Sequence, residues 1–313
     1  MEKMIVSSSP HIHAKTSTVS IMRDVLIALS PAAIASVVLF GLRALAILAV
    51  CVGFAVASEF VFNLLTKKEQ TVSDLSAAVT GLILALSLPS TAKLWQCALG
   101  SIFAIVVVKC LFGGLGCNFA NPAATARIFL LLSFASTLGG GAATVFASPD
   151  LVASATPLEL IKFGNESALP SLVDMLIGNR SGALGETCAL ALIIGGIYLI
   201  ARKVIYWHTP AIYVATVFAL SLIIKQDLTL ALYQVLGGGL LIAAFFMITD
   251  YVSTPINKGG KMVFAFGCGV ITVLIRFWGD YPEGVSFAIL LMNILSPYIE
   301  KLCAKKPFGK VGK

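Results

Sequence analysis

The sequence predicts an all-α integral membrane protein with about ten transmembrane helices, and its composition and charge pattern are the main reasons. Hydrophobic residues make up 58% of the 313 residues and charged residues only 12%, with a mean hydropathy of +0.96. A soluble domain carries about a quarter charged residues, so this chain lacks the polar side chains to cover a water-facing surface. The formal net charge of +7 does not indicate nucleic acid as a partner, because basic residues in a membrane protein mark the cytoplasmic side. The partner that composition does imply is membrane lipid.

Apolar segments give the number of helices. A hydrocarbon core about 30 Å thick needs about 20 apolar residues for each helix. The third segment is short and polar at its start, which is typical of a half-helix or a re-entrant segment. The predicted spans are 24–42, 44–65, 74–90, 94–112, 122–145, 183–201, 210–225, 229–249, 261–278 and 284–302.

The distribution of charge predicts the orientation. With the N-terminus in the cytoplasm, all but six of the 22 basic residues fall on the cytoplasmic side, whereas most acidic residues fall outside. Both termini are therefore predicted to be cytoplasmic, and the polar loop 146–181 extracytoplasmic. The six exceptions are Arg43, Lys93, Lys162, Arg180, Lys225 and Arg276.

Five predicted spans lie on each side of the 146–181 loop, which is the arrangement of an inverted repeat. Each half also has a Gly- or Pro-interrupted polar stretch on the cytoplasmic side, at 112–122 and 249–257. Such backbone is tolerated at membrane depth only where protein or a cavity satisfies it. The predicted units are a cytoplasmic N-terminal segment 1–22, a first five-helix repeat 23–145, the extracytoplasmic loop 146–181, a second five-helix repeat 182–303 and a basic cytoplasmic tail 304–313.

Two acidic side chains stand out. Asp250 follows an apolar run, where it is expected either to hold a cation or a cofactor hydroxyl, or to be an edge charge near Lys258. Glu59 lies within a predicted span, where an acid is costly unless it is paired or lines a polar path. The simpler alternative is that Glu59 reaches the inner edge, close to Lys67 or Lys68.

Lys109 and Arg127 flank the Gly-rich stretch 112–122. They are either an anion clamp or ordinary cytoplasmic flanks of the helices. The run Gly113-Gly114-Leu115-Gly116 is not a dinucleotide fingerprint, because it does not follow a strand in a βαβ unit. The seven cysteines show no C-x-x-C pair and are interpreted as small buried apolar residues. No catalytic triad, P-loop or metal-ligand cluster is recognisable.

The long outer loop carries Thr156 in the stretch Ser154-Ala155-Thr156-Pro157. Proline holds the residue before it in an extended conformation, so the Thr156 hydroxyl is expected to be presented by the loop. On local chemistry alone, the simpler interpretation is that Thr156 caps a short helix with Pro157 in its first turn.

The chain resembles the D subunit of the Rnf electron-transport complex and its relative, the B subunit of the sodium-translocating NADH:quinone reductase. The resemblance covers nearly the whole chain. It rests on four segments in the same order, which are Ser73–Pro89, Gly113–Pro122, Thr249–Asn257 and Ile275–Asn293.

The resemblance implies FMN bound covalently through its phosphate to a threonine, and the matching residue is Thr156. The usual motif is S-G-A-T before Pro-Leu, whereas this chain has Ala153-Ser154 in place of the Ser-Gly pair. Asp150, six residues upstream, matches the acid of the flavin-transferase recognition pattern. Ser154 and Asp150 are therefore assigned to the flavin-binding set with Thr156.

Some members of the wider family also hold a second, non-covalent flavin such as riboflavin. The two interrupted stretches are expected to line a second carrier site or an ion path, so Asn121, Arg127 and Asp250 are added as cofactor-binding candidates. The family also resembles urea transporters in its inverted five-helix repeats.

The function implied is that of a relay component, not a complete enzyme. It would act in a bacterial inner-membrane complex that couples electron flow between ferredoxin and NAD to export of Na⁺ or H⁺. The implied partners are the A, B, C, E and G proteins of the Rnf complex. The alternatives are a solute transporter or channel of urea-transporter type, and a purely structural assembly protein. Flavin fluorescence that survives denaturation separates the relay from both.

Overall fold

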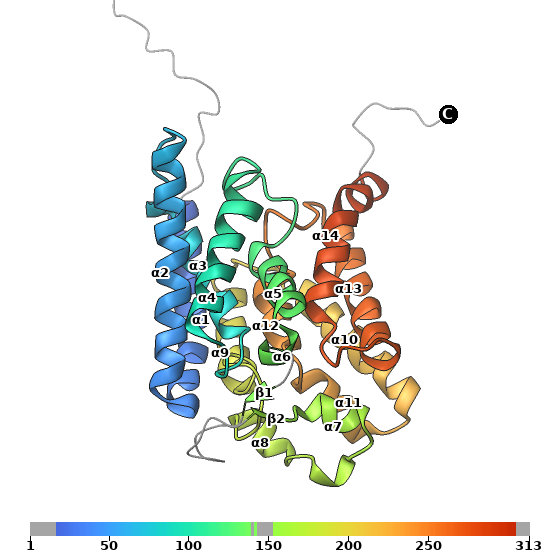
Figure 1. Ribbon diagram of the computed structural model, residues 1–313. Helices are drawn as coiled ribbons and strands as arrows, with labels where there is room; N and C mark the ends of the chain where they lie inside the picture. Colours follow the sequence, from blue (N-terminus) through green and yellow to red (C-terminus); the bar gives the residue numbers. More distant parts are fainter. Residues whose placement is uncertain (1–16, 139–140, 143–152, 305–313) are drawn as a thin grey trace, which may run out of the picture.

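The computed structural model describes residues 17–138, 141–142 and 153–304, and these residues are almost entirely helical (Figure 1). The first half contains α1 (Thr18–Phe40), α2 (Leu42–Leu65), the short η1 (Val72–Asp74), α3 (Ser76–Leu86), α4 (Leu94–Ile102), the π-helix η2 (Phe103–Cys110), α5 (Pro122–Ser133) and α6 (Ala135–Leu138). The second half contains α9 (Ala189–Ala201), α10 (His208–Lys225), α11 (Leu228–Leu236), α12 (Leu240–Ile242), the π-helix η4 (Ala243–Met247), α13 (Lys258–Trp278) and α14 (Val285–Leu302).

The connection between the halves is made of short elements. These are β1 (Gly141–Ala142), β2 (Ala153–Ser154), α7 (Pro157–Lys162), η3 (Glu166–Ala168) and α8 (Leu172–Ile177). The two strands pair antiparallel, with Gly141 opposite Ser154. Asp150 lies outside the described residues.

Helix length and composition identify a multi-pass membrane protein. Among the described residues, five helices are long and apolar enough to cross a membrane, namely α1, α2, α10, α13 and α14. A sixth candidate is α11 together with α12 and η4, which are bent by 61° at a break. Four shorter apolar helices (α3, α4 with η2, α5 and α9) occupy the remaining predicted spans. The third predicted span is indeed a short helix.

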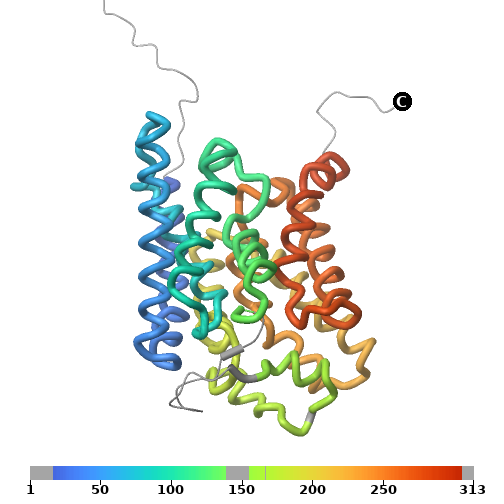
Figure 2. The backbone as a smooth tube through the Cα atoms, in the orientation of Figure 1, coloured from blue at the N-terminus to red at the C-terminus, as the bar shows by residue number. Residues whose placement is uncertain are grey.

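The two halves meet along α1 with α9, and along α5 with α14. The first contact is close because Gly195 has no side chain: a Cβ there would lie 2.1 Å from the Ala28 carbonyl oxygen. Small residues allow membrane helices to approach in this way. Figures 1 and 2 show that the described chain starts and ends at the same end of the bundle, whereas α7 and α8 lie at the opposite end.

Helix α3 ends inside the bundle. Its terminal carbonyl groups are satisfied by the segment that leads into α9: Leu184 N donates to Leu88 O at 2.9 Å, and Gly185 N donates to Leu86 O at 2.7 Å. An antiparallel bridge pairs Pro89 with Ala183 next to these bonds. The main chain of one half therefore caps the broken helix of the other, as backbone away from water requires.

Helix α11 also ends inside the bundle, but arginine side chains cap it. Arg180 Nη2 donates to Leu236 O at 2.8 Å. Arg276 donates to the carbonyl oxygens of Gln234, Gly237 and Gly238. Gly238 has φ +68°, a left-handed conformation that glycine adopts readily. Two of the six basic residues that break the charge pattern, Arg180 and Arg276, thus have a structural role.

Candidate functional site

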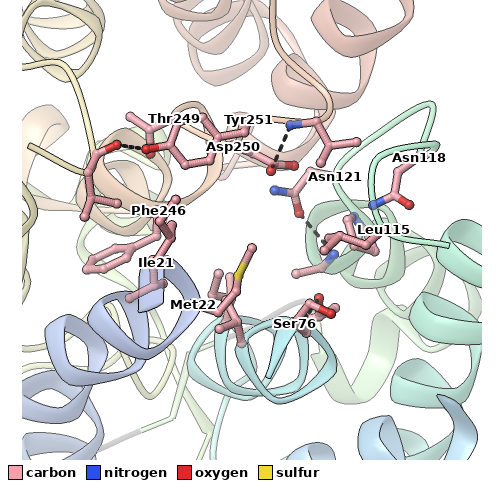
Figure 3. Close-up of a pocket in the computed structure, with 18 of the residues that line it drawn as sticks. Ile21, Met22, Ser76, Leu115, Asn118, Asn121, Phe246, Thr249, Asp250 and Tyr251 are labelled. Atoms are coloured by element: carbon pink, nitrogen blue, oxygen red, sulfur yellow. Dashed lines mark hydrogen bonds between the residues drawn. The ribbon is translucent and has the colours of Figure 1, made fainter. Parts of the chain in front are cut away.

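A cavity of about 750 Å³ opens between the two halves, and we call it the first cavity (Figure 3). Apolar side chains such as Ile21, Met22 and Phe246 form much of its wall. The polar residues that line it are Ser76, Thr80, Lys109, Asn118, Asn121, Thr249, Asp250 and Tyr251. It therefore joins the two Gly- or Pro-interrupted stretches that the sequence singled out.

Asn121 is the N-cap of α5. Its Oδ1 accepts hydrogen bonds from the N–H groups of Ala123 and Ala124, both at 3.1 Å, and Pro122 occupies the first turn. This is the local reason for the Asn-Pro pair, because a cap needs a short acceptor and proline suits the first helical position. The neighbouring Asn118 is also buried, and its Oδ1 has no partner within the described chain. An orphan oxygen at a cavity wall is a group that can receive a ligand donor.

Asp250 follows the π-helix η4 and turns back on its own loop. It accepts hydrogen bonds from Ser253 Oγ at 2.8 Å and from Val252 N at 3.3 Å. Burial raises the pKa of this carboxyl group, while these hydrogen bonds lower it. No ion pair with Lys258 is present among the described residues. Figure 3 shows the Asp250 carboxylate next to the Asn121 side chain.

The Asn293 side chain of α14 links the stretches 112–122 and 249–257 by hydrogen bonds. In the amide orientation that satisfies both ends, it donates to Ser253 O at 3.0 Å and accepts from Asn121 N at 2.9 Å. The Asn121 and Asp250 loops are therefore held in fixed relation by α14. Such a shared support is what a preorganised binding site requires.

Glu59 and Lys109 form a buried ion pair. Lys109 Nζ lies 2.7 Å from Glu59 Oε1 and donates to Ser76 Oγ at 2.7 Å. Thr71 Oγ1 donates to the same Glu59 oxygen, also at 2.7 Å. Of the two alternatives for Glu59, pairing is confirmed, whereas a side chain that reaches Lys67 or Lys68 is wrong. The carboxylate lies inside the protein because a cation from a π-helix meets it there.

Arg127 does not line the first cavity with Lys109. It pairs with Glu283, 156 residues away, at a smaller cavity of about 340 Å³ that we call the second cavity. Lys109 lines the first cavity and Arg127 the second, and each already has a carboxylate partner. The anion clamp expected from these two residues is therefore not formed.

Glu186 is the residue that sequence reasoning missed. It lines the second cavity together with Glu283 and Ser87, and only 4% of the residue is exposed. Its Oε1 accepts from Gly238 N at 2.7 Å, at the break of α11. The only signal in the sequence was an acidic residue at the start of a predicted span, which charge counting treated as an ordinary outer residue.

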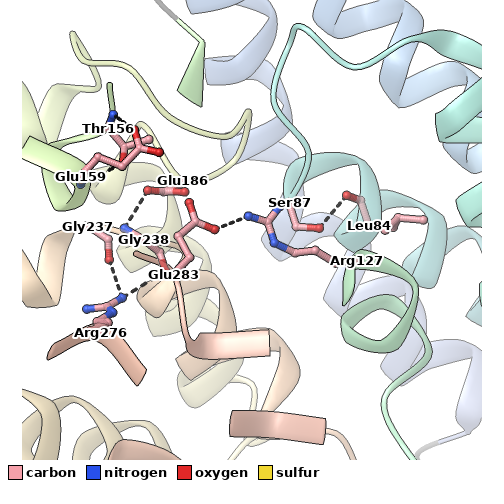
Figure 4. A network of polar contacts seen from close by, with 10 residues as sticks. All are labelled: Leu84, Ser87, Arg127, Thr156, Glu159, Glu186, Gly237, Gly238, Arg276 and Glu283. Atoms are coloured by element: carbon pink, nitrogen blue, oxygen red, sulfur yellow. Dashed lines mark hydrogen bonds and ion pairs between the residues drawn. The ribbon is translucent and has the colours of Figure 1, made fainter. Parts of the chain in front are cut away.

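Thr156 is the N-cap of α7, in the way that its local sequence predicted. Its Oγ1 accepts from Glu159 N at 3.3 Å, and its own N–H donates to Glu159 Oε2 at 2.6 Å, which is a capping box. Thr156 is only 4% exposed, so its side chain is buried at the start of α7 and not presented by the loop as expected. Two residues on, Leu158 packs against Gly237 and Gly238, so this turn adjoins the second cavity (Figure 4).

The structure therefore divides the predicted site residues among three places. Asn121 and Asp250 meet in the first cavity, Arg127 lies at the second, and Thr156 caps α7 at the end of the bundle away from the chain ends. Ser154 lies two residues before Thr156, in strand β2. No group of metal-ligating side chains occurs among the described residues.

These features define a class: an all-helical, multi-pass membrane protein whose halves enclose buried polar cavities. The family model described as "NQR2, RnfD, RnfE family" matches residues 5–309, and the chain belongs to this family.

Curated relatives agree with the family, and each of the following three is the D subunit of its complex. The chain is 47% identical to that of the "Na(+)-translocating ferredoxin:NAD(+) oxidoreductase complex" of Acetobacterium woodii, over 98% of this chain and 95% of that protein. It is 37% identical to that of the "Proton-translocating ferredoxin:NAD(+) oxidoreductase complex" of Clostridium ljungdahlii, over 97% and 96%. It is 33% identical to that of the "Ion-translocating oxidoreductase complex" of Stutzerimonas stutzeri, over 95% and 93%.

Proposed function

We propose that this chain is the D subunit of an Rnf-type complex, which couples electron transfer between ferredoxin and NAD⁺ to ion translocation. The observation that carries the proposal is 47% identity to a protein of that name over nearly the full length of both chains. The chain acts as a relay within an oxidoreductase and translocase, together with the A, B, C, E and G proteins of the complex. The translocated ion is Na⁺ or H⁺, since relatives named for each exist.

We assign both chain ends to the cytoplasm and α7, with Thr156, to the outer side of the bacterial inner membrane. The positive-inside pattern supports this orientation, and so does the position of α7 at the opposite end from both ends of the described chain. We further propose ten spans in two inverted repeats. In support, Asp74-Leu75-Ser76 leads into the short helix α3, and Asp227-Leu228-Thr229 leads into the short helix α11.

Thr156 is our proposed attachment site for FMN, together with Ser154 and Asp150 as recognition residues. The capping geometry fits an ester at this oxygen. Thr156 Oγ1 acts only as an acceptor towards the described residues, and esterification removes a hydrogen but leaves an acceptor oxygen. When bound, the flavin supplies one- and two-electron transfer. The chain contributes a fixed tether, because Pro157 and the capping box set the direction of the threonine side chain.

We propose the first cavity as the site of a second, non-covalent flavin. A flat aromatic ligand with a polar edge needs apolar walls and a few convergent donors and acceptors. Ile21, Met22 and Phe246 supply walls. The orphan Asn118 Oδ1 is available to accept from a ring N–H, and Asn121 and Asp250 lie on the same cavity. In this proposal these side chains bind and orient the ring.

The covalent site is tested by in-gel flavin fluorescence of the denatured protein, made with the flavin transferase. We expect a fluorescent wild-type band that Thr156→Val loses, because valine keeps the shape and removes the hydroxyl. Ser171→Ala is the matched control: Ser171 caps α8 as Thr156 caps α7, and it accepts from Asp174 N at 3.2 Å. That variant should stay fluorescent. A dark wild-type band, with the transferase active on another substrate, would contradict the tether and favour a solute transporter or channel of urea-transporter type.

The second flavin is tested on the same protein. Acid extraction of the native wild type should release flavin in addition to the fraction that stays with the chain. Asn118→Leu should lower the amount of extractable flavin and leave the amount of covalent flavin unchanged. The covalent flavin is therefore the internal control in each sample. Equal extractable flavin in both proteins would exclude the first cavity as its site.

A further inference from the structure

The Glu186 carboxyl group is positioned by the backbone of two helix ends. It follows directly after Leu184 and Gly185, whose N–H groups cap the end of α3. Its Oε1 accepts from Gly238 N at 2.7 Å, at the break of α11. The carboxyl group thus lies where two broken helices, one from each half, end close together.

The second oxygen of this carboxyl group has no partner. Oε2 of Glu186 is buried and accepts no hydrogen bond from the described residues. It lies at the second cavity, which offers about 20 Å³ to the centres of water molecules, more than the roughly 10–15 Å³ that one water needs. An unpaired buried oxygen beside such a space is a group that binds something from it.

The charged groups around Glu186 are all engaged elsewhere. Arg127 pairs with Glu283. Arg180 donates to the backbone oxygens of Glu186, Thr187 and Leu236 rather than to the carboxylate. On the remaining sides, Arg276 binds the α11 carbonyl groups, and Glu159 of α7 accepts from Thr156 N.

A buried carboxylate without an ion pair is costly, and the usual outcome is that the group takes up a proton. A protonated carboxyl group has one O–H donor, and Oε1 already serves as an acceptor for Gly238 N. The proton therefore belongs on Oε2, which faces the cavity.

We propose that Glu186 is a proton-binding site, which carries its proton on Oε2 and exchanges it with water in the second cavity. On release, the O–H bond breaks, the electron pair stays on the carboxylate, and a cavity water takes the proton. Glu283 and Arg127 set how tightly the proton is held. If Thr156 carries a flavin, this site lies close to it through Leu158 and Gly238. That consequence rests on the proposed function, but the proton site does not.

The test is infrared difference spectroscopy of the purified full chain through steps of pH. Glu186→Gln keeps an acceptor oxygen for Gly238 N and removes only the ionisable group. We expect a protonated carboxyl band in the wild type that shifts in D₂O, is lost at high pH and is missing from Glu186→Gln. A band that persists in this variant, or its absence from the folded wild type at every pH, would overturn the proposal.

Glu283→Gln provides the second arm. It removes a negative neighbour and releases Arg127, and both changes stabilise the ionised form of Glu186. The Glu186 band should therefore be lost at a lower pH, by about one pH unit or more. An unchanged midpoint would overturn the role given to the Arg127–Glu283 pair. Loss of the wild-type band on adding Na⁺ at fixed pH would overturn a proton site and assign the oxygen to a cation.

The same titration is made in the Thr156→Val background. The Glu186 band is expected there too, because the carboxyl group and its cavity do not depend on a tethered flavin. A band without covalent flavin would support the proton site alone, whereas covalent flavin without the band would support the tether alone. The two proposals can therefore fail separately.

Discussion

Lys109 Nζ lies 2.7 Å from Oε1 of Glu59, with both side chains only 2% exposed. The pair joins the π-helix η2 to α2 across 50 positions of sequence. Removing one partner of a buried pair leaves an uncompensated charge and typically costs about 3–5 kcal/mol, whereas removing both costs far less. Single and double substitutions at these two positions therefore measure whether the two side chains stabilise each other in the folded protein.

We expect Glu59→Gln and Lys109→Met each to lower the free energy of unfolding strongly, and the double variant to recover most of the loss. Thermal unfolding in detergent would compare the loss of stability in the double variant with the sum of the losses in the two single variants. Strictly additive effects would show that the pair is not coupled.

Arg276 should be far more sensitive than an exposed arginine. Arg276→Leu leaves the carbonyl groups of Gln234, Gly237 and Gly238 without their donor, and each buried unsatisfied group costs about 1–3 kcal/mol. Arg202, whose side chain is 54% exposed, pairs with Asp24, and Arg202→Ala should cost about 0–1 kcal/mol. Hydrogen exchange along α11 would locate the effect. Equal protection in the two variants would argue against the capping role.

Gly238→Ala should disturb the turn that carries Thr156. A Cβ at this position would lie 2.2 Å from Leu158 Cδ1, in addition to the strain of a φ of +68°. Gly164→Ala is the matched control, because Gly164 has φ +76° but nothing within 4 Å of an added Cβ. Covalent flavin should fall in the first variant and persist in the second. The same flavin content in both would show that the contact with Leu158 does not position Thr156.

Asp250 predicts a pH dependence of stability. Burial raises the pKa of this carboxyl group in the folded state. The folded state then holds a proton that the unfolded state has lost, so its contribution to stability is present below the unfolded value of about 3.9 and is lost as pH rises through the folded value. Asp250→Asn does not titrate, so wild-type stability should fall relative to this variant as pH rises.

The hydrogen bond from Ser253 lowers the Asp250 pKa and offers a control. Ser253→Ala should raise this pKa further and extend the loss of stability to higher pH. Melting temperatures from about pH 4 to about pH 8 would cover the window. A constant difference between wild type and Asp250→Asn would contradict the raised pKa.

Local features of this fold could be read from the sequence, but its long-range contacts could not. Runs of apolar residues locate the helices, the Asn-Pro pair at 121–122 begins α5, and the Thr-Pro pair at 156–157 begins α7. These depend on residues within one turn of each other. Hydropathy predicted the positions of the helices, but within the described part of the chain only five of them are long enough to span a membrane by themselves.

The contacts that build the cavities join distant residues. Glu59 meets Lys109 because α2 packs against η2, and Arg127 of α5 meets Glu283 in the segment before α14. One sequence does not encode which elements pack together. Charge counting left Arg180 and Arg276 as unexplained exceptions to the positive-inside pattern. The reason is the carbonyl groups at the end of α11. Glu186 was missed for the same cause, since its neighbours come from α5, α11 and the segment before α14.

The two broken helices should differ in how they tolerate mutation. Backbone N–H groups of Leu184 and Gly185 cap the end of α3. Every amino acid except proline has such a group, so substitutions at position 184 leave the hydrogen bond to Leu88 O in place. The end of α11 depends on the guanidinium groups at 180 and 276, which no other amino acid reproduces. In a library of random variants, the first break should tolerate changes at position 184 but not at Gly185, where an added Cβ would lie 2.6 Å from Leu86 Cβ, whereas the second break should be sensitive at both arginines.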